Sequence, residues 1–155
     1  PCDAQVMMMQ VTGEYQERAE SEGLEIISSM PPDNIRIMAD GQSLWRVFNN
    51  LFSNICKYSQ PGTRVYQILE EKDGKAVITY KNISKYELNI SSEELTERFV
   101  RGDSSRHTEG SGLGLSIARN LIELQGGRFN IFIDGDLFKV VIEFDVLESY
   151  INDKM

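Results

Sequence analysis

The sequence predicts an α+β domain with a largely antiparallel sheet. Alternating apolar and polar residues flank Asp73-Gly74, and a second alternating pair of runs flanks Gly135-Asp136, which is the pattern of two β-hairpins. The longer helix-like segments occur in three places along the chain. Strands that come in pairs, with helices elsewhere, favour the α+β class.

Length and composition describe one globular domain of 155 residues, 41% of them apolar. The net charge of −8 argues against nucleic acid or an anionic membrane as the main partner, because phosphate groups require a basic surface. The two cysteines and one histidine are too few for a zinc site or a disulfide framework, so we expect a reducing compartment. No apolar run has the length of a membrane-spanning helix, and no signal peptide is visible. Because the sequence begins at Pro1 without Met, we expect it to be an excised fragment of a longer protein.

In the first half of the chain, we expect a polar helix from Val11 that ends at Gly23. Two short strands at residues 24–30 and 35–40 follow, joined by a turn with the sequence PPDN. Residues 41–59 then form the clearest helix, because apolar residues recur at i, i+3, i+4, i+7 and i+11. These residues form one buried stripe of Leu44, Val47, Phe48, Leu51 and Ile55.

In the second half, the hairpin around Asp73-Gly74 covers residues 63–82. A short helix with an N-terminal serine cap is expected before Phe99, followed by a polar loop. A helix over residues 113–125 stops at Gly126-Gly127, and the hairpin around Gly135-Asp136 completes the sheet.

Polar residues form a second stripe on the helix at residues 41–59. Arg46, Asn50, Asn54 and Lys57 follow one another at i, i+4, i+8 and i+11. Asparagine oxygen suits Mg²⁺, and a lysine one turn further on can meet phosphate charge. A solvated helix face that happens to carry asparagine is the alternative at this point.

Glycines alternate at positions 110, 112 and 114, directly before the last predicted helix. Glycine lets backbone N–H groups approach a phosphate, and the helix N-terminus adds a favourable dipole. No Gly-Lys-Ser/Thr run follows, and a polar loop rather than a strand precedes the glycines, so neither a Walker A loop nor a Rossmann fingerprint fits.

Taken together, these segments resemble the ATP-binding catalytic domain of sensor histidine kinases, within the wider group of DNA gyrase B, mismatch-repair ATPases and a heat-shock chaperone. The family's N box is similar to FNNLFSNICKYS (48–59), and its F box with the start of its ATP lid to TERFVRGDSSR (96–106). Its second glycine box matches GSGLGLSIARNLIELQGG (110–127) almost letter for letter. The resemblance runs from about Val11 to Leu147.

The resemblance implies a two-layer α/β sandwich of the Bergerat type, with a mixed, mostly antiparallel sheet, helices on one face and a mobile ATP lid. The catalytic domain would occupy residues 11–155, after a residual linker at residues 1–10.

The resemblance also implies a role for each matching residue. Asn54 would be the Mg²⁺ ligand, with Asn50 helping to hold metal or phosphate. Lys57 would contact phosphate, and Arg101 would approach the γ-phosphate when the lid closes. Tyr58 would flank the nucleotide. Backbone amides would reach the phosphates from Gly110, Gly112, Leu113, Gly114 and Leu115.

One motif of the family is degenerate in this chain. The first glycine box, Asp-x-Gly-x-Gly, provides an aspartate that accepts a hydrogen bond from the adenine amino group. Counting back from Phe99 places that aspartate at Asn82 and the first two glycines at Ser84 and Tyr86. Asparagine still offers a carbonyl acceptor. Its neutral hydrogen bond is ~1 kcal/mol weaker than a charge-assisted one, about five- to tenfold in affinity, so we expect a weakened site.

The implied function is that of a two-component sensor histidine kinase, in which the domain binds Mg-ATP and donates the γ-phosphoryl group to a histidine. That histidine would lie on a separate dimerisation domain of the same parent protein. The resemblance also implies a response regulator as a partner. The one histidine here, His107, lies in a lid-like loop and is followed by Thr108 rather than an acidic residue. We therefore expect that this chain lacks its own phosphate acceptor.

Two alternatives remain open. The first is a nucleotide-incompetent interaction module, which the degenerate first glycine box suggests. Such a module would not bind Mg-ATP at millimolar concentration. A gyrase-type ATPase would hydrolyse ATP steadily and dimerise, but such proteins usually carry a catalytic glutamate where the polar stripe here has Arg46. We expect no nucleic-acid partner, no direct membrane contact by this domain and a cytoplasmic location, and we leave open whether the parent protein is anchored in a membrane.

Overall fold

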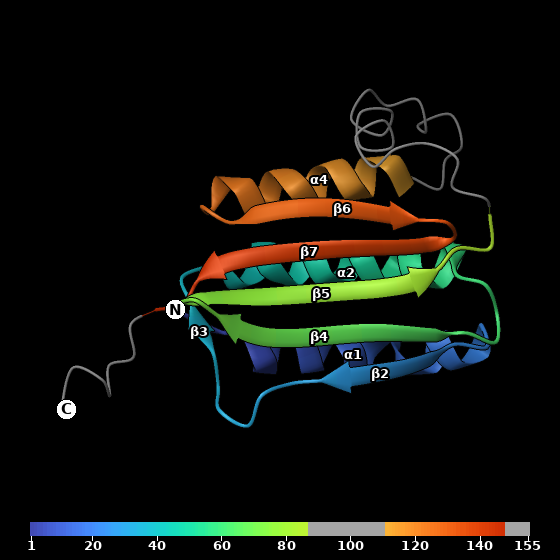
Figure 1. Cartoon of the computed structure of the whole chain (residues 1–155), viewed down its shortest axis with the longest axis horizontal. Helices are drawn as coiled ribbons and strands as arrows, with labels where there is room; N and C mark the ends of the chain where they lie inside the picture. The colour runs from blue at the N-terminus through green and yellow to red at the C-terminus, as the bar shows by residue number, and fades with distance from the viewer. Residues whose placement is uncertain (87–110, 148–155) are drawn as a thin grey trace.

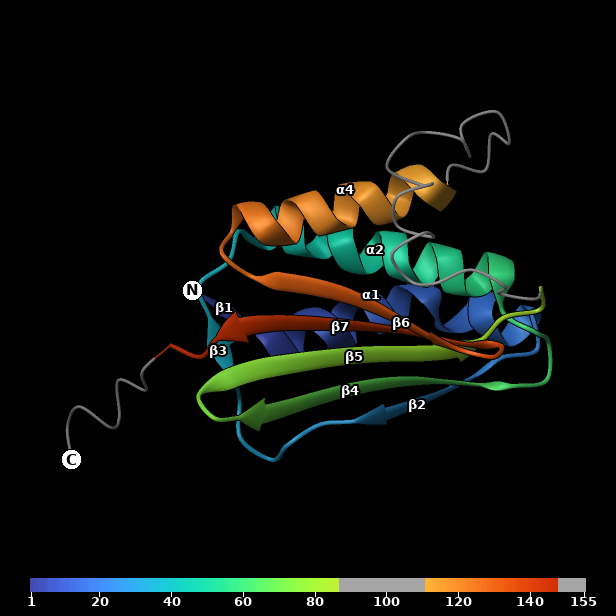
Figure 2. The ribbon, with the colours of Figure 1, turned by 45° about the horizontal axis from the view of Figure 1, so that its top comes forward.

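The structure describes residues 1–86 and 111–147, apart from the side chains of residues 111–114. In this computed structural model, helices cover one face of a five-stranded sheet (Figures 1 and 2). The helices are α1 (Ala4–Ser21), α2 (Gly41–Tyr58) and α4 (Ser111–Leu124). The strands of the sheet are β2 (Glu25–Ser29), β4 (Arg64–Lys72), β5 (Lys75–Ile83), β6 (Arg128–Asp134) and β7 (Leu137–Asp145).

The sheet has the order β2-β4-β5-β7-β6 and is mostly antiparallel. The two predicted hairpins, β4-β5 and β6-β7, are confirmed. The strands before and after the PPDN turn do not pair with each other. Strand β2 pairs in parallel with β4, and β3 (Arg36–Ile37) pairs with β1 (Cys2–Asp3) in a separate small sheet. A parallel pair requires a long crossover, which α2 supplies.

The first helix begins earlier than the sequence predicts, at Ala4 rather than Val11. Asp3 caps it, because its side chain accepts a hydrogen bond from the backbone N of Val6 at 3.2 Å. Ala4 and Met8 are fully buried, so part of the segment expected to be a linker contributes to the domain's core.

Helix α2 is the centre of the core. Every residue of the predicted apolar stripe is buried, and Phe52 and Cys56 are buried beside it. Helices α1 and α4 both pack against α2, one on each side of it (Figure 2). Burial raises the pKa of the Cys56 thiol, as expected for a packing residue rather than a reactive one.

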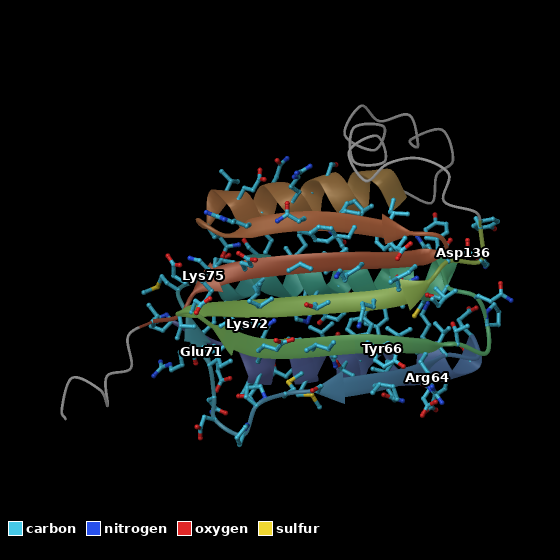
Figure 3. The ribbon with its side chains drawn as sticks, in the orientation of Figure 1. Arg64, Tyr66, Glu71, Lys72, Lys75 and Asp136 are labelled. Atoms are coloured by element: carbon cyan, nitrogen blue, oxygen red, sulfur yellow. The ribbon has the colours of Figure 1, made fainter. Side chains whose placement is uncertain are left out.

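The opposite face of the sheet carries charged and aromatic side chains (Figure 3). Tyr66 lies under the ammonium group of Lys81, whose Nζ is 5.3 Å from the ring centroid. Lys75 forms an ion pair with Asp145 at 2.7 Å. These side chains point away from the helices, and the apolar core lies between the sheet and the helices.

The short helix predicted before Phe99, the lid-like loop with His107, and the site residues Arg101 and Gly110 lie outside the described residues. Among the helices within residues 1–86 and 111–147, none combines the length and the apolar character needed to cross a bilayer.

Candidate nucleotide-binding site

Three segments of the predicted site meet at one end of the molecule. At the opposite end, the backbone N of Asp40, directly before α2, donates to Oε1 of Gln125, directly after α4, at 2.5 Å. The beginning of α2 therefore lies beside the end of α4. Because α2 and α4 also pack along each other, they run in opposite directions. Both helices rise about 1.5 Å per residue, so the 14 residues of α4 reach roughly the level of Asn54, the fourteenth residue of α2. Strand β5 ends at the same end of the molecule (Figures 1 and 2).

Helix α2 brings the predicted metal and phosphate residues to this end. The side chains of Asn50, Asn54, Lys57 and Tyr58 are all half-buried. The Nδ2 atom of Asn54 is buried and has no hydrogen-bond partner among the described residues. By contrast, Oδ1 of Asn49 accepts a hydrogen bond from the hydroxyl of Tyr15 at 2.6 Å, so Asn49 faces α1. Asn54 thus differs from Asn49, because the side chain of Asn49 is bonded to α1 whereas Nδ2 of Asn54 is bonded to none of the described residues.

Asn82 lies at the end of β5 and is only 5% exposed. Its Nδ2 donates to Oγ of Ser59 at 2.8 Å. Ser59 is the C-cap of α2, and its backbone also forms an isolated bridge with Ser84. The residue at the predicted adenine position is therefore attached directly to the end of the helix that carries Asn54.

The segment after Asn82 has an ordered backbone in place of the family's glycines. Oγ of Ser84 accepts from the backbone N of Tyr86 at 3.0 Å and donates to the carbonyl of Tyr86 at 2.8 Å. The backbone N of Ser84 donates to the carbonyl of Asp136 at 2.8 Å, and Asp136 lies at this end of the sheet (Figure 3). The backbone N of Lys85 donates to the carbonyl of Tyr58 at 2.9 Å. These bonds fix the segment between α2 and the β6-β7 turn.

The glycine-rich run enters the site as part of a helix. The sequence predicted a helix from residue 113, but α4 begins at Ser111, so Gly112, Leu113 and Gly114 belong to its first turn. The first four N–H groups of a helix have no partner within it and carry partial positive charge. The side chain of Leu115 is 5% exposed and belongs to the core, so this residue is suited to offer its backbone rather than its side chain.

These residues fit a magnesium-bound nucleotide. Nδ2 of Asn54 has no partner in the part of the chain that the structure describes, and the nitrogen and oxygen of an amide can exchange places by a flip that leaves its shape unchanged. Oxygen donors with few protein ligands are typical of Mg²⁺ bound together with phosphates. Sequence reasoning missed Ser59 and the ordering role of Ser84, although a serine directly after the Lys-Tyr pair was visible in the sequence.

Residues 39–146 match the family described as "Histidine kinase-, DNA gyrase B-, and HSP90-like ATPase". The signal transduction histidine-protein kinase BaeS of Escherichia coli (strain K12) is 32% identical over 130 residues, which are 83% of this chain and 28% of BaeS. The probable sensor protein PcoS of Escherichia coli is 37% identical over 113 residues, which are 70% of this chain and 24% of PcoS. The chain thus spans about a quarter of the length of these two relatives.

Solved structures show the same fold. The nucleotide-free catalytic domain of the histidine kinase ThkA superposes with a TM-score of 0.79 at 21% identity, covering 93% of this chain and 93% of that one. Full-length ShkA, solved in complex with AMPPNP, has a TM-score of 0.77 at 23% identity and covers 96% of this chain and 31% of that one.

Proposed function

The chain belongs to the histidine kinase-, DNA gyrase B- and HSP90-like ATPase family, as an ATP-binding catalytic domain of the sensor histidine kinase type, and from this premise we propose that it binds Mg-ATP and donates the γ-phosphoryl group to a protein histidine. The observation that carries the proposal is the buried Nδ2 atom of Asn54, which has no hydrogen-bond partner within residues 1–86 and 111–147 and lies level with the start of α4. A buried polar group without a partner costs free energy, and a ligand that binds the group is one reason for a protein to retain it.

The site would act mainly by positioning. Asn54, with Asn50 beside it, would hold Mg²⁺, which neutralises phosphate charge when it is bound. Lys57 would contact phosphate from the last turn of α2. The backbone N–H groups of Gly112, Leu113 and Gly114 would bind phosphate oxygens at the start of α4.

The base would lie near the end of β5. Asn82 would accept a hydrogen bond from the adenine amino group, and Tyr58 would flank the nucleotide. Arg101 and Gly110 remain part of the proposal through their match to the family motifs, since they lie outside the described residues.

We also propose that the phosphate acceptor is a histidine on a dimerisation domain of the parent protein, with a response regulator as the downstream partner. Phosphoryl transfer of this kind requires little covalent chemistry from the donor domain. A site of asparagine, lysine, arginine and backbone amides is suited to it.

Calorimetric titration of the purified chain with ATP, with and without Mg²⁺, tests the proposal. We expect Mg²⁺-dependent binding in the micromolar to millimolar range that Asn54→Ala abolishes and Asn49→Ala preserves. Phosphotransfer to a supplied helical domain containing the acceptor histidine is the next measurement. Absence of binding by folded protein at millimolar Mg-ATP would favour the interaction module, and steady hydrolysis with dimerisation would favour a gyrase-type ATPase.

A further inference from the structure

The hydrogen bond between Asn82 and Ser59 joins an amide and a hydroxyl, which can exchange the roles of donor and acceptor. Nδ2 of Asn82 donates to Oγ of Ser59 at 2.8 Å, and the two residues are 5% and 3% exposed. A serine hydroxyl both donates and accepts. If the asparagine amide flips, the hydroxyl donates to Oδ1, and the bond is kept with its direction reversed.

The direction of this bond decides what Asn82 offers to a base. With Nδ2 on Ser59, the carbonyl oxygen of Asn82 is left as an acceptor, which matches the 6-amino group of adenine. With Oδ1 on Ser59, the amide NH₂ is left as a donor, which matches the 6-carbonyl oxygen of guanine or hypoxanthine. An aspartate at this position only accepts when ionised, and its charge disfavours a carbonyl oxygen nearby.

A second feature near Asn82 offers contact area that does not depend on the base. The rings of Tyr58 and Tyr86 lie with their centroids 6.5 Å apart and their planes at 58°. Tyr86, at a position that is glycine in the family motif, is 60% exposed, and Ser84 holds its backbone on both sides. Aromatic side chains stack on all bases because every base has a π-face.

From these contacts we infer that the site accepts purine nucleoside triphosphates with either a 6-amino or a 6-oxo group, because the Asn82–Ser59 pair can reverse. The inference rests on the proposed nucleotide site and specifies its substrate class. The stacking surface would supply affinity for any purine, and the reversible pair would remove the discrimination that an aspartate provides.

The test compares ATP, GTP and ITP, each with Mg²⁺, by calorimetric titration of the whole chain and of Asn82→Asp. ITP carries the 6-oxo group without the 2-amino group of guanine, so it isolates the contact at position 6. We expect the wild-type dissociation constants for ATP and ITP to agree within about tenfold. Asn82→Asp should raise the ratio of the ITP constant to the ATP constant by about tenfold or more, because it replaces a reversible group with a charged acceptor.

Tyr86→Gly is the matched control, because it restores the glycine of the family motif without touching the Asn82–Ser59 pair. It should weaken ATP and ITP by the same factor and leave their ratio unchanged. Should the wild type bind ATP but bind ITP more than about tenfold more weakly, the inference is overturned and the proposed function stands. If folded wild type binds no nucleotide, the inference falls together with the proposed function. The titrations of the wild type with ATP and ITP decide between these outcomes, even if Asn82→Asp does not fold.

Discussion

The carboxylate of Asp40 accepts two hydrogen bonds from Ser43 at the start of α2. The hydroxyl of Ser43 lies 2.7 Å from Oδ2, and its backbone N lies 3.0 Å from the same atom. Asp40 is the N-cap of the helix that carries the asparagines of the site. The hydrogen bonds to the side chain and then to the backbone of Ser43 lower the pKa of the Asp40 carboxyl.

This cap should make stability depend on pH in the acid range. Because the folded pKa lies below the unfolded value of about 3.9, the stabilisation by the carboxylate is fully present above the unfolded pKa. It is lost as the pH falls through the folded pKa. We expect Asp40→Asn, which keeps an acceptor but no charge, to be less stable than the wild type at neutral pH, with a gap that narrows below about pH 4. Urea unfolding at a series of pH values measures the gap, and Ser43→Ala should shrink its pH dependence. A gap of constant size would contradict the prediction.

Gly127 is required by packing between α4 and the sheet. A Cβ atom there would lie 2.9 Å from the carbonyl oxygen of Glu143, from Cγ2 of Ile122 and from Cε1 of Phe144. Gly127→Ala should therefore lower the free energy of unfolding by about 1–3 kcal/mol through overpacking. Gly13→Ala is the control, because Gly13 lies inside α1 with nothing within 4 Å of its Cβ position. That change should raise the free energy of unfolding by about 0.5–1 kcal/mol. Equal effects of the two changes in denaturant unfolding would refute the packing argument.

A polar network lies inside the core, around the fully buried Gln67. The hydroxyl of Tyr80 donates to Oε1 of Gln67 at 3.0 Å, and Nε2 of Gln67 donates to Thr12 at 2.5 Å and to Ser28 at 2.8 Å. Burial also raises the pKa of Tyr80, which keeps its hydroxyl protonated as a donor. The network connects α1 with three strands and has every amide atom of Gln67 paired.

Tyr80→Phe should leave Oε1 of Gln67 without its donor and destabilise the fold by about 1–3 kcal/mol. Tyr66→Phe removes a hydroxyl from the open face and keeps the ring under Lys81, so its effect should stay within about 0.5 kcal/mol. Guanidinium unfolding of both variants measures the difference. If Tyr80→Phe were as stable as the wild type, the hydrogen bond to Gln67 would contribute nothing net.

The elements that the sequence predicted well are those with local signals. Asp73 and Gly74 have φ values of 52° and 79°, the conformation that favours Asp-Gly in a two-residue hairpin turn, so β4 and β5 were visible in the sequence. The parallel pairing of β2 with β4 depends on a crossover through α2 and has no local signal. The start of α1 was missed because Val6 and Met9 are 50% exposed while Met8 is buried, so apolar residues there do not mark one face.

The residues of the candidate site also divide into those with a local signal in the sequence and those without one. Asn54 and the glycines of α4 became candidates through spacing within single segments, and the family resemblance gave them their predicted roles. The position of Asn82 came from its distance to Phe99 in the family pattern. Its bond to Ser59 joins residues 23 positions apart and was not predictable, because it depends on how the end of α2 meets the end of β5.

Asn54 and Asn49 should respond oppositely when each is replaced by alanine. Nδ2 of Asn54 is buried without a partner among the described residues, so Asn54→Ala removes an unsatisfied group whose burial costs about 1–3 kcal/mol. We expect the free energy of unfolding without nucleotide to stay unchanged or to rise, and the stabilisation by Mg-ATP to disappear. Asn49→Ala removes the nearer acceptor of the Tyr15 hydroxyl, Oδ1 at 2.6 Å, and leaves the backbone carbonyl of residue 49 at 3.2 Å. It should therefore destabilise the free protein by up to about 1 kcal/mol while the shift with Mg-ATP persists. Thermal unfolding of both variants, with and without Mg-ATP, separates the two effects. A loss of stability in Asn54→Ala without nucleotide, equal to that of Asn49→Ala, would mean that Asn54 serves packing rather than a ligand.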